Sequence, residues 1–468
     1  MRRSIFLTAL GLAALAGVAG CALVPDGTDE ERANLRAAGA LYDQPLEQRT
    51  LPDLPASPTW QEVLRRAFLA NGDLEASYFE WKAAVQRVEI ASAYPNSNLE
   101  FGYSYMFSAE KMKAFDRQTF SLGFDPSMNF LIPTKVRQQG RVALDDARAA
   151  GERFRAAKFD TQRRVLSLWA ELRMLESRRQ VQHEQVRLNR LSIDAVRARA
   201  QAGGVQRDLL RAEASLRTQE NGLRNTESEL SATRAILNGL LVRDPAVAID
   251  TTGDSARTIA ATDDQILAAA VELNPEIAAI ARQTEGRADA LELARMQWIP
   301  DINPSFMFTG NVSQALGATV MLPTTIARIR GGIREAEAML RAGEAMLRQT
   351  RTDRAATLVA TLVALRNNER QAALFEGSLV PLAERVLQNT RQAYAAGTAM
   401  YIDLLDAQGI VLDTRLVAIE ARSARDKRLA ELESLMGTDI EAVGASPVPA
   451  SSPIHQMTPD PKEAPHGR

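Results

Sequence analysis

The sequence predicts a mainly α-helical protein with a small β part, built from a duplicated long-helix hairpin, and three observations carry this prediction. Hydrophobic residues make up 46% of the 468 residues but aromatic residues only 5%, and Ala, Leu, Arg, Glu and Gln are abundant, which is typical of long helices. Long proline-poor segments follow Pro133 and Pro323. The same order of helix, two short strands, proline turn and long hairpin occurs twice along the chain.

The first copy opens with a predicted helix over 60–94. Two short segments with alternating polar and apolar residues follow, at 99–105 and 119–124, and this alternation predicts β-strands. The next residues, 131–134, read Leu-Ile-Pro-Thr. Proline is accommodated at a helix start because the first N–H groups of a helix have no partner within it. A long helix over 134–202 is therefore expected.

The second copy repeats these features in the same order. A helix is expected over 264–298, strands over 305–308 and 315–320, and a Met-Leu-Pro-Thr turn at 321–324. The long helix that follows extends over 324–396. We expect a kink in it at Pro381, because proline lacks the N–H that a helix interior requires.

Each long helix ends at a glycine and is followed by a returning helix. Ala-Gly-Gly at 202–204 and Ala-Gly-Thr at 396–398 mark the two hairpin tips, and the returning helices extend over 205–238 and 400–436. Apolar residues along the long segments are spaced alternately three and four apart, which predicts helices packed side by side in a left-handed coil; they are Val165, Leu168, Leu172, Leu175, Phe375, Leu379, Leu382 and Val386.

Helix lengths predict how the pieces stack. The long helix 134–202 would span about 100 Å at ~1.5 Å per residue. The shorter helices 205–238 and 264–298, placed end to end, match that length. In the same way, 400–436 and 60–94 match the second long helix. We therefore expect these two pairs to stack end to end beside the two long helices.

The N-terminus has the features of a bacterial signal sequence. Arg2 and Arg3 precede an apolar stretch over 5–15 that is too short to span a bilayer. It ends in Val-Ala-Gly-Cys at 18–21, which resembles a lipobox, in which the chain is cut before Cys21 and the thiol is lipidated. The alternative is an ordinary signal peptide with an incidental cysteine. Because Cys21 is the only cysteine, disulfides within one chain and cysteine-based metal sites are excluded.

The predicted organisation has six parts. Proline-rich composition indicates an extended linker before the first copy and a disordered tail after the second. The parts are a lipoprotein signal peptide (1–20), a lipidated N-terminal linker (21–59), the first helix–strand–strand–helix repeat (60–240), an equatorial connector (241–263), the second repeat (264–440) and the disordered tail (441–468).

Composition argues against an enzyme and against nucleic-acid binding. The net charge is −2 and basic residues alternate with acidic ones, so no basic surface for nucleic acid is expected. The three histidines, His183, His455 and His466, suit no zinc or triad arrangement, and no phosphate-binding glycine loop is present. Five methionines near the strands could favour Cu(I), but methionine more often fills cores or faces lipid; they are Met106, Met112, Met128, Met307 and Met321.

The ordered combination of repeats, proline turns, glycine tips and lipobox resembles the TolC-like outer-membrane efflux proteins over about residues 60–437. The resemblance implies a trimeric α-helical barrel capped by a 12-strand transmembrane β-barrel, with four strands per chain. Open strand edges are not tolerated in lipid, so one chain could not close such a barrel. Aromatic residues of the strands are expected to face lipid, and the alternation does not decide which face of the sheet this is. These residues are Phe101, Tyr103, Tyr105, Phe120, Phe306 and Phe308.

The resemblance also implies a function. It indicates a passive homotrimeric exit duct of a tripartite efflux system (RND or ABC type) or a type I secretion system, anchored in the outer membrane by lipid on Cys21 and extending into the periplasm, with no cofactor. Partners would be a periplasmic adaptor protein and, through it, an inner-membrane pump. The competing functions are a periplasmic adaptor (membrane-fusion) lipoprotein and a structural lipoprotein without a pore.

Two sets of site residues follow. Asp403 and Asp406 lie on one helix face just after the second tip and would form a periplasmic gate of carboxylate rings; the alternative is an ordinary acidic pair near a helix N-terminus. The tips would receive the adaptor, because exposed leucines there favour burial; the alternative is that these leucines pack within the hairpin's own core. The tip residues are Gly203, Leu209, Leu210, Gly397, Leu404 and Leu405.

Overall fold

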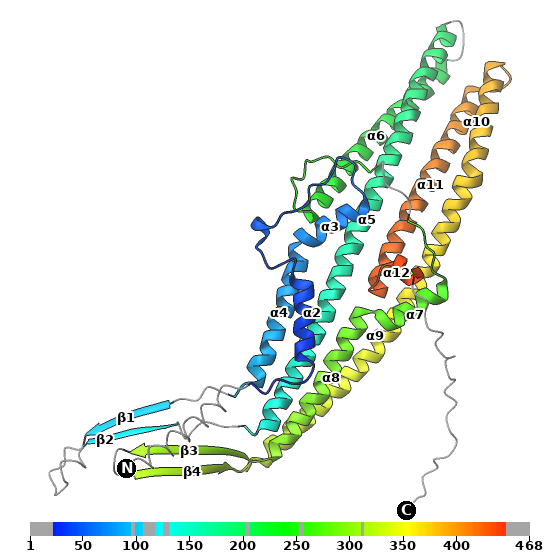
Figure 1. The fold of residues 1–468 in the computed structure, drawn as a ribbon. Coiled ribbons are helices and arrows are strands. Elements are labelled where there is room, and N and C mark those ends of the chain that lie inside the picture. Colours follow the sequence, from blue (N-terminus) through cyan, green and yellow to red (C-terminus); the bar gives the residue numbers. More distant parts are fainter. Residues whose placement is uncertain are drawn as a thin grey trace, which may run out of the picture.

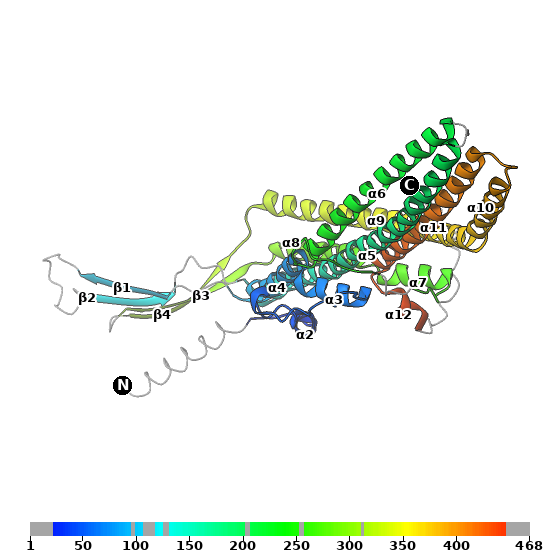
Figure 2. The ribbon, with the colours of Figure 1, turned by 90° about the horizontal axis from the view of Figure 1, so that it is seen from above.

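The protein is a long helical body with a small antiparallel sheet extending from one end, as Figures 1 and 2 show. The computed structural model describes residues 22–94, 99–105, 118–124, 131–201, 206–251, 257–309 and 313–445. Among these residues, none of the helices is both long enough and apolar enough to cross a membrane. The mainly helical fold with a small β part agrees with the sequence prediction.

Local sequence sets the helix boundaries of the first copy. Thr59 and Glu62 form a reciprocal capping box at the first helix, and the Asn71 side chain caps the second by accepting the Leu74 N–H. These caps satisfy N–H groups that have no partner within the helix. The elements of this copy are α3 (Trp60–Ala70), α4 (Gly72–Ser92), β1 (Leu99–Tyr105), β2 (Gln118–Phe124), α5 (Pro133–Gln201) and α6 (Gln206–Leu240).

The second copy repeats the same caps at the same places. Thr262 and Gln265 form a capping box, and Asn274 accepts N–H groups of Glu276 and Ile277 at the start of the next helix. The duplicated plan therefore extends to individual capping residues. The elements are α7 (Asp263–Leu273), α8 (Pro275–Arg295), η3 (Met296–Trp298), β3 (Asp301–Thr309), β4 (Ser313–Met321), α9 (Ile326–Leu374), η4 (Phe375–Leu379), α10 (Val380–Ala395), α11 (Tyr401–Met436) and α12 (Ile440–Ala445).

The interruption expected at Pro381 is present as one turn of π-helix, η4, immediately before α10. Proline has no N–H to donate, and its ring clashes with the carbonyl four residues earlier in a regular α-helix. Widening the preceding turn to π geometry accommodates both effects. The second long helix is thus made of two α-helical parts, α9 and α10, joined by this turn.

The helices form one curved layer with a fixed order. In the half nearer the sheet the order is α4, α5, α8, α9, and in the other half it is α6, α5, α11, α10. The long helix α5 contacts all four half-length helices, whereas α9 contacts α8 and α11. Within one chain, α4 and α6 therefore lie at one edge of the layer, and α9 and α10 lie at the other.

The predicted pairing of the half-length helices is wrong. The end of α11 meets the start of α8, where the Asn274 side-chain amide donates to the Leu435 carbonyl at 2.6 Å. The end of α6 meets α3, where the Arg66 guanidinium donates to the Leu241 carbonyl at 3.1 Å. Lengths could not decide the pairing, because the four predicted segments are nearly equal in length. The prediction of one continuous helix over 60–94 and over 264–298 is also wrong, since each segment is broken into two helices, at Asn71 and at Asn274.

The N-terminal segment is not wholly an extended linker, which corrects the prediction for 21–59. Residues Thr28–Gly39 form α2, which packs on α4 and α5, and a short 3₁₀ turn follows at Leu46–Gln48. The prolines of the segment lie outside Thr28–Gly39, and three acidic residues in the first turn favour a helix start. The α2 residue Glu31 is buried and accepts the Trp81 indole N–H at 2.7 Å.

The predicted disordered tail also begins too early. Residues Ile440–Ala445 form α12, whose buried Ile440 and Val443 join an equatorial core with residues of α7, α9 and α11. Two apolar residues three apart on a helix supply a packing face, and the proline-rich composition begins only after them. Residues 446–468 lie outside the described part of the chain.

A buried ion-pair cluster lies at the equator, the level of the helical body where α6 meets α3 and α11 meets α8. The Arg257 guanidinium pairs with Glu433, whose side chain is fully buried, and with the more exposed Glu441. It also lies over the Trp60 ring at 4.4 Å. Burial raises the pKa of Glu433, while the hydrogen bond and charge of Arg257 act in the lowering direction. This cluster ties the connector to α3, α11 and α12.

The four strands form one antiparallel sheet in the order β1-β2-β3-β4. The central pair β2–β3 joins the two copies, so β1 and β4 are the sheet edges within the chain. Tyr103 lies opposite Phe120, and Leu122 lies opposite both Phe101 and Phe308. Because directly opposed positions share a face, positions 101, 103, 105, 120, 306 and 308 all belong to one face of the sheet.

Candidate functional site at the helical tips

The ends of the two hairpins farthest from the sheet lie side by side and share one core (Figure 1). Tyr401 and Leu404 of α11 are 3% and 6% exposed in this core. Residues of all four tip helices contribute, so the core joins the hairpins to each other; they are Ile193, Val196, Ala212, Ala383, Leu387, Tyr401, Leu404, Ala407 and Val411.

The predicted docking residues at the tips divide into two groups. Leu404 is buried in the shared core, and Leu209 and Leu405 pack against it partly buried. Leu210 is 61% exposed, and Met400, which the sequence argument missed, is 66% exposed. Packing within the protein's own core therefore accounts for Leu404, whereas Leu210 and Met400 are apolar side chains open to a partner.

Gly397 closes the second hairpin tip. Gly397 has φ +77°, and a side chain there would meet open space. Its left-handed conformation closes the turn between α10 and α11, which explains the preference for glycine. Gly203 lies outside the described residues, as does Cys21.

Asp403 and Asp406 are both exposed on α11. The Asp403 carboxylate accepts the Met400 N–H at 2.8 Å and so caps its own helix. Asp403 also lies at a helix N-terminus, where the alternative interpretation places an ordinary acidic pair. Capping uses one carboxylate oxygen and leaves the negative charge at the tip, so both side chains add charge to the same surface.

Tyr401 is a tip residue that the sequence argument did not identify. Its ring lies 5.8 Å from that of Tyr394, and burial, with Tyr394 and Asp208 nearby, raises the pKa of Tyr401 to about 12. The tyrosine thus stays neutral and brings α11 close to the start of α6. Its position directly before the Ile-Asp-Leu-Leu segment was the only available signal.

Between the tip core and the equator, ion pairs join the hairpins. Arg415 of α11 contacts Glu384 of α10 at 2.5 Å and Glu184 of α5 at 3.2 Å. Arg178 of α5 contacts Glu420 of α11 at 2.6 Å. These partly exposed pairs contribute little stability individually, so the apolar tip core is the stronger connection.

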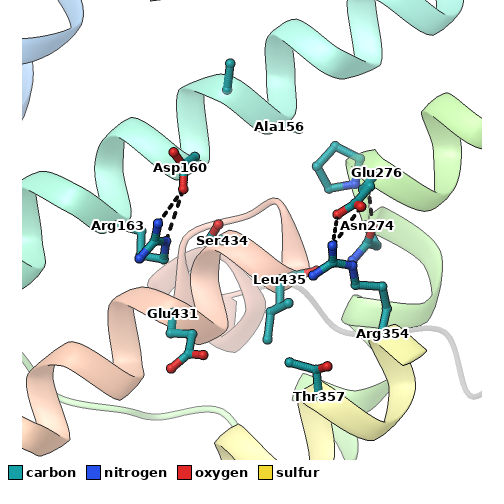
Figure 3. A pocket seen from close by; sticks show the side chains of 12 residues that line it. Ala156, Asp160, Arg163, Asn274, Glu276, Arg354, Thr357, Glu431, Ser434 and Leu435 are labelled. Atoms are coloured by element: carbon teal, nitrogen blue, oxygen red, sulfur yellow. Dashed lines mark hydrogen bonds and ion pairs between the residues drawn. The ribbon is translucent and has the colours of Figure 1, made fainter. Parts of the chain in front are cut away.

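An open cleft of about 450 Å³ lies at the equator, where α11 ends and α8 begins. Figure 3 shows two charged pairs in it, Arg163 with Asp160 and Arg354 with Glu276 at 2.6 Å. Glu431, which also lines the cleft, pairs with Arg428 outside the lining. The cleft is therefore a polar joint between stacked helices, and its charged side chains already have protein partners.

The methionines of the Cu(I) hypothesis lie largely outside the described residues. Separately, across the described ranges, no group of three or more His, Cys, Asp or Glu residues could hold an ion. Met321 is 45% exposed at the end of β4. Met106, Met112 and Met128 lie outside the described residues, and His183 is an exposed helix residue.

Comparison with known proteins agrees with the fold. Residues 259–438, which cover most of the second repeat, match the family model described as outer membrane efflux protein. The match covers less than half of the chain, so it shows that the second repeat is similar to this family. The predicted resemblance is thereby confirmed, and members of this family are channel proteins rather than enzymes. No curated protein matches the sequence.

Solved structures of outer membrane proteins and channels share the fold at low identity. The outer membrane protein VceC from Vibrio cholerae is 18% identical, with 81% of this chain and 96% of that chain covered and a TM-score of 0.70. The open-state MtrE channel from Neisseria gonorrhoeae is 16% identical, with 84% and 94% covered and a TM-score of 0.70. The CmeC channel from Campylobacter jejuni is 13% identical, with 81% and 85% covered and a TM-score of 0.67.

Proposed function

We propose that three copies of this chain form a passive exit duct in the outer membrane, which serves a tripartite efflux system of RND or ABC type or a type I secretion system. The observation that carries this proposal is the pair of open edges. Strand β1 and helix α4 end the layer on one side, and β4 and α9 end it on the other. Unpaired strand edges and uncovered helix flanks favour pairing with another copy.

Exposed apolar residues concentrate at these edges. Helices α9 and α10 alone carry eight of them, 42–63% exposed, and α4 carries Phe79 and Ile90. By contrast, the part of α8 between its neighbours α5 and α9 has none among the large exposed residues. Several apolar side chains exposed along one edge favour an interface there. The edge residues of α9 and α10 are Ile326, Met339, Met346, Val359, Val363, Leu374, Leu382 and Val386.

The sheet would be completed by the same contact. Pairing β4 of one copy with β1 of the next would close three four-stranded sheets into a 12-strand barrel without open edges, as lipid requires. The register supports this, because the six aromatic positions share one face, which would form the lipid-facing band. The helices would continue as a hollow cylinder into the periplasm.

The position of the N-terminal segment supports a lipid anchor on Cys21. The Leu23 N–H donates to the Ser92 carbonyl at 2.8 Å, and Ser92 is the last residue of α4, on the way to β1. Residue 23 therefore lies where the helical body meets the sheet. Acyl chains on a cysteine two residues earlier would enter the bilayer at the level of the proposed barrel.

The tips would act as the periplasmic gate. The shared apolar core holds the hairpins together, and Asp403 and Asp406 would place carboxylate rings at the narrow mouth. We expect Asp403→Asn with Asp406→Asn to lower the preference of the channel for cations in planar bilayers. Asparagine keeps an oxygen that can cap the helix, so the change removes charge alone.

Asp413 supplies a matched control for that experiment. It is exposed on the same helix, seven residues beyond Asp406 and farther from the tip. Asp413→Asn should leave cation preference closer to that of the wild type. Unchanged conductance and selectivity in the double variant would remove the gate assignment.

We further propose that the tips receive a periplasmic adaptor through Leu210 and Met400. A thiol-specific crosslinker on Leu210→Cys or Met400→Cys should capture a co-expressed adaptor, whereas Val271→Cys, which is 74% exposed on α7 at the equator, should capture less. These positions avoid Gly397, where a side chain would be strained. Equal capture at all three positions, or none, would count against tip docking.

A further inference from the structure

One face of the helical body carries the N-terminal segment. Pro25 packs closely against Gly140 of α5, and Asp26 lines a cleft with Arg141 of α5 and Ala288 of α8. We call this side the N-terminal face. If Cys21 is lipidated, as the proposed function requires, its acyl chains must reach the bilayer rather than the bore. The N-terminal face is then the outer face of the duct.

Arg137 lies on this face, because it precedes Gly140 by three residues and Arg141 by four on the same helix. It is exposed and lies four residues after the start of α5 at Pro133, about 6 Å along the helix axis. Among the described residues it forms no ion pair. An unpaired arginine is therefore held close to the sheet on the outer side.

Two arginines of α9 lie on the same face. Arg295 follows Ala288 by seven residues on α8, which places the two on one side of that helix. Arg295 contacts Glu337 of α9 at 3.7 Å, and Arg330 precedes Glu337 by seven residues. Arg330 and the neighbouring Arg334 are exposed and, within the described ranges, form no ion pair. Arg330 lies four residues after the start of α9.

Exposed apolar residues gather directly beside these arginines. They lie at the junction between the sheet and the helices, and each is between 42% and 69% exposed. An apolar band bordered by arginines is the pattern of a membrane–water interface, where the apolar groups enter the bilayer and the cations meet headgroups. The residues are Trp298, Ile299, Ile302, Val320, Leu322 and Ile326.

We propose that Arg137, Arg330 and Arg334 bind the phosphate groups of anionic phospholipids in the leaflet that would hold the Cys21 acyl chains. This inference rests on the proposed outer-membrane duct and names its lipid partner. Arginine forms charge-assisted hydrogen bonds with phosphate in a fixed geometry, and basic residues next to a bilayer attract anionic lipid.

The acidic residues deeper on the same face set a limit to this site. Arg141 and Arg148 line a cleft with a larger number of carboxylates, Asp26, Asp145, Glu285 and Asp289. Burial and then the nearby Asp289 raise the pKa of Asp145 to about 6, although Arg148 acts in the lowering direction. An anionic headgroup would be repelled there. The lipid site is therefore confined to the first two or three turns of α5 and α9.

The test compares lipid binding by the full-length lipidated protein in neutral-detergent micelles containing phosphatidylglycerol and phosphatidylethanolamine, with bound lipid counted by native mass spectrometry. We expect the wild type to retain phosphatidylglycerol preferentially, and less so at high salt. Arg330→Gln with Arg334→Gln should reduce that preference by about fivefold for each charge removed. Arg137→Gln should act in the same direction.

Arg341→Gln with Arg348→Gln is the matched control, since both are exposed and lie seven and fourteen residues beyond Arg334 on the same side of α9. These changes should leave the preference intact. The proposal is overturned if the control variant loses as much preference for phosphatidylglycerol as the test variants do, or if the test variants keep that preference. It is also overturned if they alter ion selectivity instead, because the arginines would then line the bore.

Trimer mass and conductance are measured on the same wild-type samples. If the wild type shows neither a trimer mass nor conductance, the proposed duct is contradicted. If it shows both but has no lipid preference, only the lipid site is contradicted. Arg137→Gln guards against an indirect effect at the edge of the layer, because α5 is flanked on both sides by helices of its own chain.

Discussion

Leu404→Ala should open the tips and raise the conductance of the channel in planar bilayers. Leu404 is 6% exposed in the core that joins the two hairpins. Removing a buried leucine side chain costs about 2–5 kcal/mol of packing free energy. If the closed arrangement depends on this core, the ratio of open to closed tips should rise by at least tenfold, since a tenfold change corresponds to ~1.4 kcal/mol.

Leu210→Ala is the control, because this leucine is close to the same tip but 61% exposed. It should leave conductance nearly unchanged. Tyr401→Phe offers a milder change in the same core, since it keeps the ring and removes only the hydroxyl. Equal conductance for Leu404→Ala and the wild type would show that the tip core does not hold the duct closed.

Arg257→Ala should lower the free energy of unfolding by about 3–5 kcal/mol, because it leaves a buried charge without its partner. The Glu433 side chain that pairs with Arg257 is fully buried, and it also accepts hydrogen bonds from Gln162 and the Ile440 N–H. Urea unfolding followed by far-ultraviolet circular dichroism measures this loss. Adding Glu433→Gln to the variant should restore part of it.

The pH dependence of the Arg257→Ala variant has a defined sign. Without Arg257, the pKa of Glu433 rises further above its usual value, because the group that lowers it is gone. The folded protein then holds a proton that the unfolded chain has released, so the variant should lose stability as pH rises above about 4.3. Arg428→Ala, which removes a surface pair with Glu431, should change stability by less than about 1 kcal/mol at any pH.

Much of the fold was predictable because local signals and lengths agreed. The proline turns, the glycine tips and the alternating strands marked the element boundaries within a few residues, and Pro381 correctly predicted an interruption. The stacking of the half-helices was not predictable, because nearly equal lengths permit either pairing. Only contacts distant in sequence, such as that between Asn274 and Leu435, distinguish them.

The candidate site was predicted in part. The aspartates and Leu210 were identified as exposed tip residues, but sequence alone could not separate Leu210 from Leu404, which differ in burial and not in residue type. The Arg257–Glu433 pair joins residues 176 positions apart, and no local pattern marks such a contact. Helix α2 was missed because the prolines around it dominated the composition of the segment.

The number of chains in the purified particle tests the central claim most directly. Native mass spectrometry of the full-length lipidated protein, released from a neutral detergent, counts these chains without labelling. Three chains per particle are expected, because one chain leaves β1 with α4 and β4 with α9 as open edges. A particle with a single chain would contradict the account, since those edges would then be stable without a partner.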